Sequence, residues 1–409
     1  MQHKIRIGKI LTCSLFIVVL NLPLAAQLTC TAPQFPNTEK RILAPMPCLG
    51  WEPLALTTFP AEFNKWYNDH FGLRSLALLG YSLFKVNGLG LSSSDKVIRG
   101  REGWLYYRPT VEHWRARSRY TKDELTAWKC RLTNREVWLA GVGARYLFIM
   151  VPNKPTIYPE FLPPNQIRIL PQTASEQLAS TVAGRTTGAN TKDLPFLDLT
   201  PILRKARRAQ VVYYRTDSHW NEAGCLIAYR AILDRLTTIG LSITPQGLED
   251  FTTTRGTFQA DLASMLGLAD FNDEITTDYH PRISPTQEIP IDPDLIATWQ
   301  AAAFNNHKGQ GTLLMIGDSF GRWKLLALLS IHFKRTAFVH RKLFPGTVAA
   351  FESCFATIGR PDKTHPYVVL EETVEHELGL PETQQPITQL FTTSSTAADR
   401  LARQSPKEL

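Results

Sequence analysis

Two short motifs contain the residue types of a catalytic triad. Gly-Asp-Ser-Phe-Gly at residues 317–321 contains Ser319, and Thr-Asp-Ser-His-Trp-Asn at residues 216–221 contains Asp217 and His219. A serine hydroxyl becomes a good nucleophile when a histidine takes its proton. A carboxylate bonded to that histidine fixes its tautomer and stabilises the imidazolium. We therefore interpret Ser319 as a nucleophile, His219 as its base and Asp217 as the residue that orients the base.

Each motif also has a simpler interpretation. Gly, Asp and Ser are common between a strand and a helix, where Asp318 or Ser319 could act as an N-cap. Asp217 or Ser218 could likewise cap the next helix, or Asp217 and His219 could bind a metal. The sequence has no CxxC and no further ligand cluster, so we expect neither a metal nor another cofactor. We favour the triad because two chemically matched motifs each follow an apolar segment.

The segments around the motifs predict how they are positioned. Apolar residues at 312–316 and 211–214 predict buried strands before the first and second motif, and helices are predicted at 320–332 and 221–238. A turn from strand to helix gathers backbone N–H groups, and the helix dipole favours negative charge there. In a parallel sheet, ligands bind beyond the carboxyl ends of the strands. We therefore expect both motifs at the carboxyl edge of one sheet.

The other segments extend this α/β pattern. Strands are predicted at 145–151, 196–199, 336–340 and 367–371, a β-hairpin at 96–107, and helices at 75–87 and 124–143. Residues 243–300, rich in Thr, Pro and Asp, indicate a loop-rich insertion. Alternation of strands and helices predicts a mostly parallel sheet covered on both faces.

The N-terminus indicates export. Lys4, Arg6 and Lys9 precede an apolar stretch at residues 10–26 that ends in small residues, as in a signal peptide. A retained signal anchor is the alternative, because Leu24 is bulky for the position three before the cut. The predicted divisions are a signal peptide or anchor (1–26), an irregular arm (27–60), a catalytic domain (61–380) and a flexible tail (381–409).

Charge and cysteines restrict the function further. The formal net charge is +8, but three of the positive side chains lie in the first nine residues. The basic run at 204–208 is short and isolated, so we expect no nucleic-acid partner. Cys30 could pair with Cys48, or either of them with Cys130, whereas Cys225 lies in an amphipathic segment and is expected to be a buried thiol.

Four segments, taken in order, resemble one family. They are Asn-Asp-His-Phe-Gly-Leu-Arg (68–74), Lys-Val-Ile-Arg-Gly-Arg-Glu-Gly-Trp-Leu-Tyr (96–106), Pro-Asn-Lys-Pro-Thr-Ile-Tyr-Pro (152–159), and residues 214–221 followed by Gly-Asp-Ser-Phe (317–320). In this combination the chain resembles the AlgJ/AlgX-like alginate O-acetyltransferases, a periplasmic branch of SGNH hydrolases with permuted block order. The resemblance covers roughly residues 60 to 380.

The resemblance implies an SGNH-hydrolase-like three-layer α/β/α fold and a function. Asp217 and His219 match the family's Asp-x-His, and Ser319 matches its nucleophile. Such proteins move acetyl groups onto hydroxyls of an exported polysaccharide and receive them through a membrane-bound O-acyltransferase partner. We expect the AlgJ form, because no carbohydrate-binding module follows the catalytic region. The chain departs from the family at His376, where we expected an arginine.

Weaker candidates come from position alone. Asn153, at a predicted strand end, could donate to an oxyanion, although asparagine is also a common turn residue. Trp220 beside His219 could stack on a sugar, although tryptophans are more often core residues. Arg322 and Arg341 could bind a uronate carboxylate, or be ordinary surface or helix-terminal arginines.

Three functions fit these residues. An O-acetyltransferase acting through acetyl-serine is the first, and we favour it. The same triad makes a carbohydrate acetyl esterase or deacetylase if water is the acceptor, and the sequence does not separate these two. A non-catalytic polysaccharide-binding scaffold of a secretion complex is the third, which an intact Ser/His/Asp set disfavours.

Overall fold

The computed structural model describes residues 2–29, 43–48, 53–183, 194–241, 243, 248–269, 274–282, 287–290, 293–362 and 364–378. They divide into two compact units. The first comprises Met1–Arg99 and Gln259–Asp273, and the second comprises Gly100–Phe258 and Glu274–Leu409. This division differs from the single catalytic domain that we predicted for residues 61–380.

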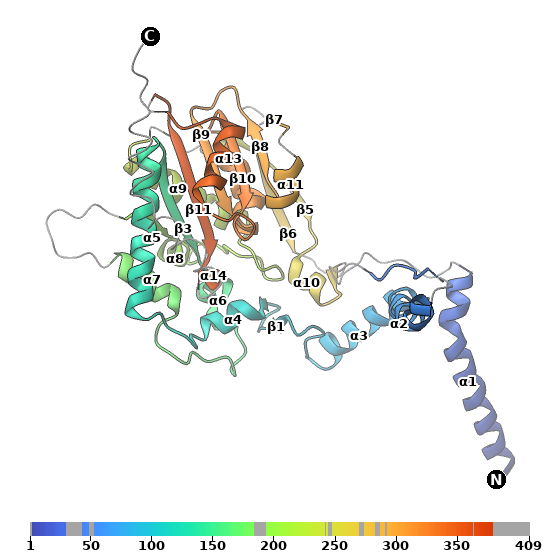
Figure 1. The fold of residues 1–409 in the computed structure, drawn as a ribbon. Coiled ribbons are helices and arrows are strands. Elements are labelled where there is room, and N and C mark those ends of the chain that lie inside the picture. Colours follow the sequence, from blue (N-terminus) through green and yellow to red (C-terminus); the bar gives the residue numbers. More distant parts are fainter. Residues whose placement is uncertain are drawn as a thin grey trace. The chain divides into compact units, whose positions relative to one another are not determined.

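The first unit is largely helical. Helix α1 (Gln2–Leu28) contains a 20-residue stretch, Lys9–Leu28, with a mean hydropathy of 2.0, long and apolar enough to cross a membrane (Figure 1). It is followed by α2 (Pro53–His70), α3 (Arg74–Leu83), the π-turn η1 (Phe84–Gly88), β1 (Val97–Arg99) and α10 (Asp261–Met265). The prediction of an irregular arm over 27–60 was therefore wrong at both ends. Pro53 is compatible with helix because the first turn needs no N–H donor there.

A seven-stranded sheet forms the centre of the second unit (Figure 1). Its strands, in spatial order, are β4 (Phe196–Asp198), β3 (Arg145–Val151), β11 (Tyr367–Val374), β9 (Thr312–Gly317), β10 (Arg335–His340), β8 (Ala302–Asn305) and β7 (Gln287–Glu288). The first five run parallel, and the pairs β10–β8 and β8–β7 are antiparallel. This confirms the mostly parallel α/β sheet predicted from the apolar segments.

Helices cover both faces of this sheet. Besides a separate strand pair described below, the unit also contains β2 (Leu105–Tyr107), α4 (Arg108–Trp114), α5 (Lys122–Gly141), α6 (Lys154–Ile157), η2 (Pro159–Phe161), α7 (Ala174–Ala183), α8 (Thr200–Ala206), α9 (Glu222–Thr238), η3 (Leu248–Asp250), α11 (Pro293–Trp299), η5 (Gly321–Leu325), α12 (Leu326–Ser330), α13 (Val348–Ile358) and α14 (Glu375–Leu378). In Figure 1, α13 lies in front of the sheet and α8 and α9 lie behind it. Phe148 and Ile316 pack with helical residues in one core cluster, while their neighbours Leu147 and Met315 are fully buried as well. Burial on both faces explains the continuous apolar strands.

A buried ion pair ties α5 to the central strand β11. Glu371 accepts from Arg131 at 3.1 Å and from Tyr146 Oη at 2.6 Å, and it also pairs with Arg135. Burial alone would raise the pKa of Glu371, but the two arginines lower it to about 2. The carboxylate therefore stays charged, and α5 is fixed in register against the sheet.

Two predicted segments differ in the structure. Residues 211–214 form no strand of the sheet, because Tyr213 makes only an isolated bridge with Trp220. Residues 243–300 contain more regular structure than predicted, since β5 (Phe251–Thr257) pairs antiparallel with β6 (Ile275–Pro281). In both segments the secondary structure is decided by tertiary contacts, which the local amino-acid composition does not reveal.

The predicted cysteine pairs are also not formed by the cysteines that the structure describes. Cys48 and Cys130 are free thiols, and Cys225 is the buried thiol on α9 that we expected. Cys30 and the predicted tail (381–409) lie outside the described residues.

Candidate active site

The side chains of Asp217, His219 and Ser319 form one hydrogen-bonded chain. Asp217 Oδ1 lies 2.7 Å from His219 Nδ1, and His219 Nε2 lies 2.8 Å from Ser319 Oγ. A carboxylate only accepts, so Nδ1 donates to Asp217 and Nε2 is left to accept the serine proton. Asp217 is 3% exposed, which shields this charge-assisted bond from water. The arrangement is that of a base poised to activate a serine.

Ser319 lies on a turn that Asp318 holds in place. Strand β9 ends at Gly317, and Asp318 Oδ1 then accepts from Phe320 N at 2.9 Å. Its other oxygen accepts from Val374 N at 3.1 Å, at the end of the neighbouring strand β11. Asp318 thus has the capping role that the simpler interpretation gave it, and by doing so it orients the serine beside it.

The two glycines of the motif allow close packing beneath Ser319. A Cβ on Gly317 would lie 2.9 Å from Glu372 Oε2, and one on Gly321 would lie 2.7 Å from the same atom. Glu372 is fully buried and accepts from Asp318 N at 3.0 Å. Burial, with the nearby Asp318 charge, raises the pKa of Glu372 well above its usual value. Glycine is therefore needed at both positions, because a side chain at either one would collide with the buried carboxyl group of Glu372.

Lys154 positions the loop that carries Asp217 and His219. Its ammonium donates to three backbone carbonyls of that loop, those of Tyr214 (3.0 Å), Arg215 (3.0 Å) and Asp217 (2.6 Å). Lys154 is only 2% exposed, so the loop is held by a buried charge. Sequence reasoning did not single this residue out, although it lies in the Pro-Asn-Lys-Pro segment that supported the resemblance.

Further bonds fix both ends of the same loop. Leu105 N of β2 donates to Arg215 O at 2.8 Å, and Thr216 N donates to Glu274 Oε2 at 2.8 Å. Helix α9 is capped by Asn221, whose side chain accepts from Gly224 N at 3.0 Å. The cap is therefore Asn221, and Asp217 and Ser218 do not serve as one.

The two motifs reach the site by different routes. Ser319 follows the carboxyl end of β9, as predicted. Asp217 and His219 instead lie on the connection between α8 and α9, outside the sheet. Val212 and Tyr213 are completely buried because this connection packs inward, and its Val212 N donates to Tyr158 Oη at 3.0 Å. Burial without strand pairing explains why the segment resembled a strand.

Asn153 and Ser319 follow strands that are not neighbours in the sheet. Strand β11 lies between β3, which precedes Asn153, and β9, which precedes Ser319. The side-chain oxygen of Asn153 contacts His376 Nδ1 at 2.8 Å. Asn153 Nδ2 is buried without a hydrogen-bond partner among the residues described.

The aromatic and arginine candidates are engaged elsewhere. Trp220 is 2% exposed and packs edge-on against Phe320, with ring centroids 5.3 Å apart, so it is a core residue and its ring is not open to a sugar. Arg322 donates to Gln300 O at 3.1 Å. Arg341 has a side chain 7% exposed and lies 3.9 Å from Glu377, which balances its charge.

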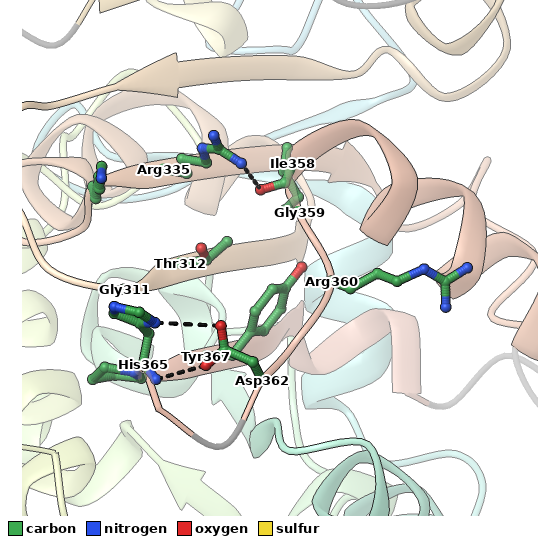
Figure 2. Close-up of a pocket in the computed structure, with 11 residues that line it drawn as sticks. Gly311, Thr312, Arg335, Ile358, Gly359, Arg360, Asp362, His365 and Tyr367 are labelled. Atoms are coloured by element: carbon green, nitrogen blue, oxygen red, sulfur yellow. Dashed lines mark hydrogen bonds and ion pairs between the residues drawn. The ribbon is translucent and has the colours of Figure 1, made fainter. Parts of the chain in front are cut away.

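A pocket at the other edge of the sheet is separate from these residues. Figure 2 shows Thr312, Arg335 and Tyr367 lining it, which are the first residues of β9, β10 and β11. Its cavity volume is about 170 Å³. Ser319 follows the opposite end of β9, roughly 20 Å away at 3.3 Å per strand residue. The pocket therefore does not belong to the candidate active site.

Glu375, behind Asn153, predicts a pH-dependent stability. It is 1% exposed and accepts from Asn153 N at 2.8 Å and Ser175 Oγ at 3.1 Å. Burial raises its pKa to about 7 despite these bonds. The unfolded chain loses this proton near pH 4.5, so the free energy of unfolding should fall by about 3 kcal/mol as the pH rises from 4.5 to 7.

The Glu375→Gln variant tests this expectation. Glutamine keeps the shape of the Glu375 side chain but cannot ionise. The difference in unfolding free energy between the variant and the original protein should therefore change between pH 4.5 and 7 and stay constant above pH 7. Urea unfolding at a series of pH values measures it. Parallel pH curves for the two proteins would contradict the assignment.

The chain is similar to known proteins in sequence and in fold. The family described as "SGNH hydrolase-like domain, acetyltransferase AlgX" matches residues 97–375. The chain is 26% identical over 280 residues to the "Probable alginate O-acetylase AlgJ" of Pseudomonas aeruginosa. That match covers 64% of this chain and 65% of the relative, so it spans slightly less than two thirds of the curated protein.

A solved structure has the same fold. The structure of Bacillus cereus PatB1 superposes with a TM-score of 0.51 at 15% sequence identity, covering 71% of this chain and 99% of that one. The family match and the parallel sheet together confirm the expected SGNH-like α/β fold. Because the family match extends over more than half of the sequence and includes both motifs, the chain belongs to the family of SGNH hydrolase-like acetyltransferase domains of the AlgX type.

Proposed function

We propose that this protein is a serine O-acyltransferase that moves acetyl groups onto hydroxyls of an exported polysaccharide. The observation that carries the proposal is the continuous hydrogen-bonded chain from Asp217 through His219 to Ser319. Membership of an acetyltransferase family supports the acetyl group as the one transferred. Ser319 is the nucleophile, His219 the general base and acid, and Asp217 the residue that stabilises the imidazolium.

The reaction has two balanced steps. Ser319 Oγ attacks the carbonyl carbon of an acetyl ester while His219 Nε2 takes the hydroxyl proton. The bond to the leaving oxygen then breaks, that oxygen takes the proton from His219, and acetyl-Ser319 remains. In the second step a sugar hydroxyl gives its proton to His219 and attacks the acetyl carbon. The serine oxygen recovers the proton as the acetylated sugar leaves.

The backbone at Ser319 supplies a donor for the oxyanion of each step. Ser319 and Phe320 begin the helical segment after β9, where N–H groups have no acceptor within the helix. Phe320 N is already bonded to Asp318, so the Ser319 N–H is the one we assign to the oxyanion. The positive end of the helix dipole acts in the same direction.

The polymer and the donor are inferred from the relative. The curated AlgJ protein is named as an alginate O-acetylase, so we propose an alginate-like, uronate-containing acceptor. We also propose, from the resemblance, that a membrane-bound O-acyltransferase supplies the acetyl group. The apolar helix α1 would serve as export signal or anchor and keep the protein in the periplasm, close to such a partner.

A transfer assay tests the function. The purified protein is incubated with a chromogenic acetyl ester, with and without a uronate oligosaccharide, and the products are weighed by mass spectrometry. We expect acetylated oligosaccharide in place of free acetate when the acceptor is present. Free acetate alone would identify an esterase, and no turnover at all would favour a scaffold.

The export prediction needs the native host. The mature chain should begin at Gln27, or the uncut chain should fractionate with the membrane through α1. N-terminal sequencing of the protein from separated cell fractions measures this. Full-length protein free in the cytoplasm would refute it.

A further inference from the structure

An exposed tryptophan lies beside the catalytic histidine that we propose. Among the tryptophans that the structure describes, Trp104, Trp128 and Trp220 are at most 4% exposed, whereas Trp323 is 45% exposed. Trp323 follows Ser319 by four residues, within the π-turn η5. Its ring lies edge-on to His219, with ring centroids 5.7 Å apart and planes at 70°. Such π-turns frequently occur at functional sites.

The indole is held firmly in this exposed position. Phe258 and Tyr214 contact it, with ring centroids at 5.8 Å and 6.3 Å. The ammonium of Lys324 lies 4.9 Å from the centroid of the indole ring. Lys324 is in turn bound by Glu222 and, at 2.9 Å, by Asp278 of β6. A rigid aromatic surface needs little ordering when a ligand binds to it.

The exposed ring is larger than an acetyl group requires. Phe320 already packs against His219, with ring centroids 4.7 Å apart, and it is 6% exposed. It thus forms an apolar wall for the two-carbon acyl group. A tryptophan is the largest apolar surface that a side chain offers, and stacking suits a flat ring with an apolar face. The apolar C–H face of a pyranose has this shape.

We propose that Trp323 is the platform on which the acceptor sugar ring stacks. This inference rests on the proposed function and adds the residue that selects the acceptor. Because the indole and imidazole centroids are 5.7 Å apart, a sugar stacked on the indole lies next to His219, the base that activates its hydroxyl. Trp323 thereby positions the second substrate and takes no part in forming acetyl-Ser319.

Binding and kinetics test the platform separately. Calorimetry measures the Kd of a uronate oligosaccharide for Ser319→Ala and for Ser319→Ala with Trp323→Ala. We expect about tenfold weaker binding in the double variant, equivalent to about 1.4 kcal/mol.

In the chain that keeps Ser319, the single Trp323→Ala variant should raise the KM for the oligosaccharide by a similar factor. The burst of acetyl-enzyme from a chromogenic ester without acceptor should stay within about twofold. Trp323→Phe should lie between.

A matched control is available in Tyr81. It is 50% exposed and lies at the same 4.9 Å from a lysine ammonium, that of Lys85, but belongs to the other compact unit. Tyr81→Ala should change neither Kd nor KM. An unchanged Kd for Trp323→Ala, or a lost burst with an unchanged KM, would overturn the platform. If the wild-type protein released only free acetate, the proposed transfer would fail, while the Kd comparison would still decide the role of Trp323.

Discussion

The Ser319→Ala variant should lose acetyl-ester turnover by about four to six orders of magnitude. It removes the atom that forms the ester bond, and it removes the partner of His219 Nε2, now 2.8 Å away. Volume and charge on the turn barely change, because Asp318 and the two glycines keep their contacts. Mass spectrometry after incubation with a chromogenic acetyl ester should show no acetylated protein, and circular dichroism should show an intact fold.

The neighbouring serine provides a matched control. Ser218 Oγ lies 3.4 Å from His219 Nδ1, on the side of the ring away from Ser319. Ser218→Ala should therefore change turnover little. His219→Ala should be nearly as harmful as Ser319→Ala, and Asp217→Asn somewhat less so, because the imidazole then meets the wrong partner. Double variants should not be additive, since the three residues act as one unit. Near-normal turnover by a folded Ser319→Ala protein would make the scaffold interpretation the better one.

Much of the sheet, and the grouping of Asp217, His219 and Ser319, was predictable from the sequence. Strands β3, β9 and β10 and the first half of β11 carry mostly apolar side chains on both faces, because helices cover the sheet on each side. Such segments are recognised without knowing the tertiary structure. Ser319 follows one of them directly, so its place at the sheet edge followed from the order of the residues. The spacing of Asp217 and His219 likewise determines that carboxylate and imidazole can meet.

The rest depends on contacts between distant segments. Residues 211–214 are apolar because they pack against the core, yet they pair with no strand of the sheet. Only the fold shows that Lys154, some 60 residues earlier, binds the loop that follows them. The β5–β6 pair joins segments separated by the part of the chain that belongs to the first unit. Trp323 is another example, since sequence reasoning favoured Trp220 for its closeness to His219. Which of two nearby tryptophans is exposed is decided by helix phase and neighbours, not by spacing from the histidine.

Lys154→Met should have the second-largest effect on the protein. The three carbonyls of Tyr214, Arg215 and Asp217 would lose their donor, and the loop is buried enough that water cannot fully replace it. Each unsatisfied buried group costs about 1–3 kcal/mol, so the free energy of unfolding should drop by about 3–5 kcal/mol. Removal of the donor also frees Asp217 to move, and turnover should fall by at least about 100-fold even in molecules that remain folded.

The measurement must separate instability from misplacement of Asp217. Urea unfolding gives the stability of Lys154→Met, and ester turnover is assayed well below the unfolding midpoint. Lys205→Met is the matched control, because Lys205 is exposed on α8 and should change neither quantity. If Lys154 acts by holding the loop, the fall in turnover should persist at low temperature, where the folded fraction is close to one. Turnover that recovered fully whenever the variant was folded would reduce Lys154 to a residue of general stability, and the loop would then be positioned mainly by Leu105 and Glu274.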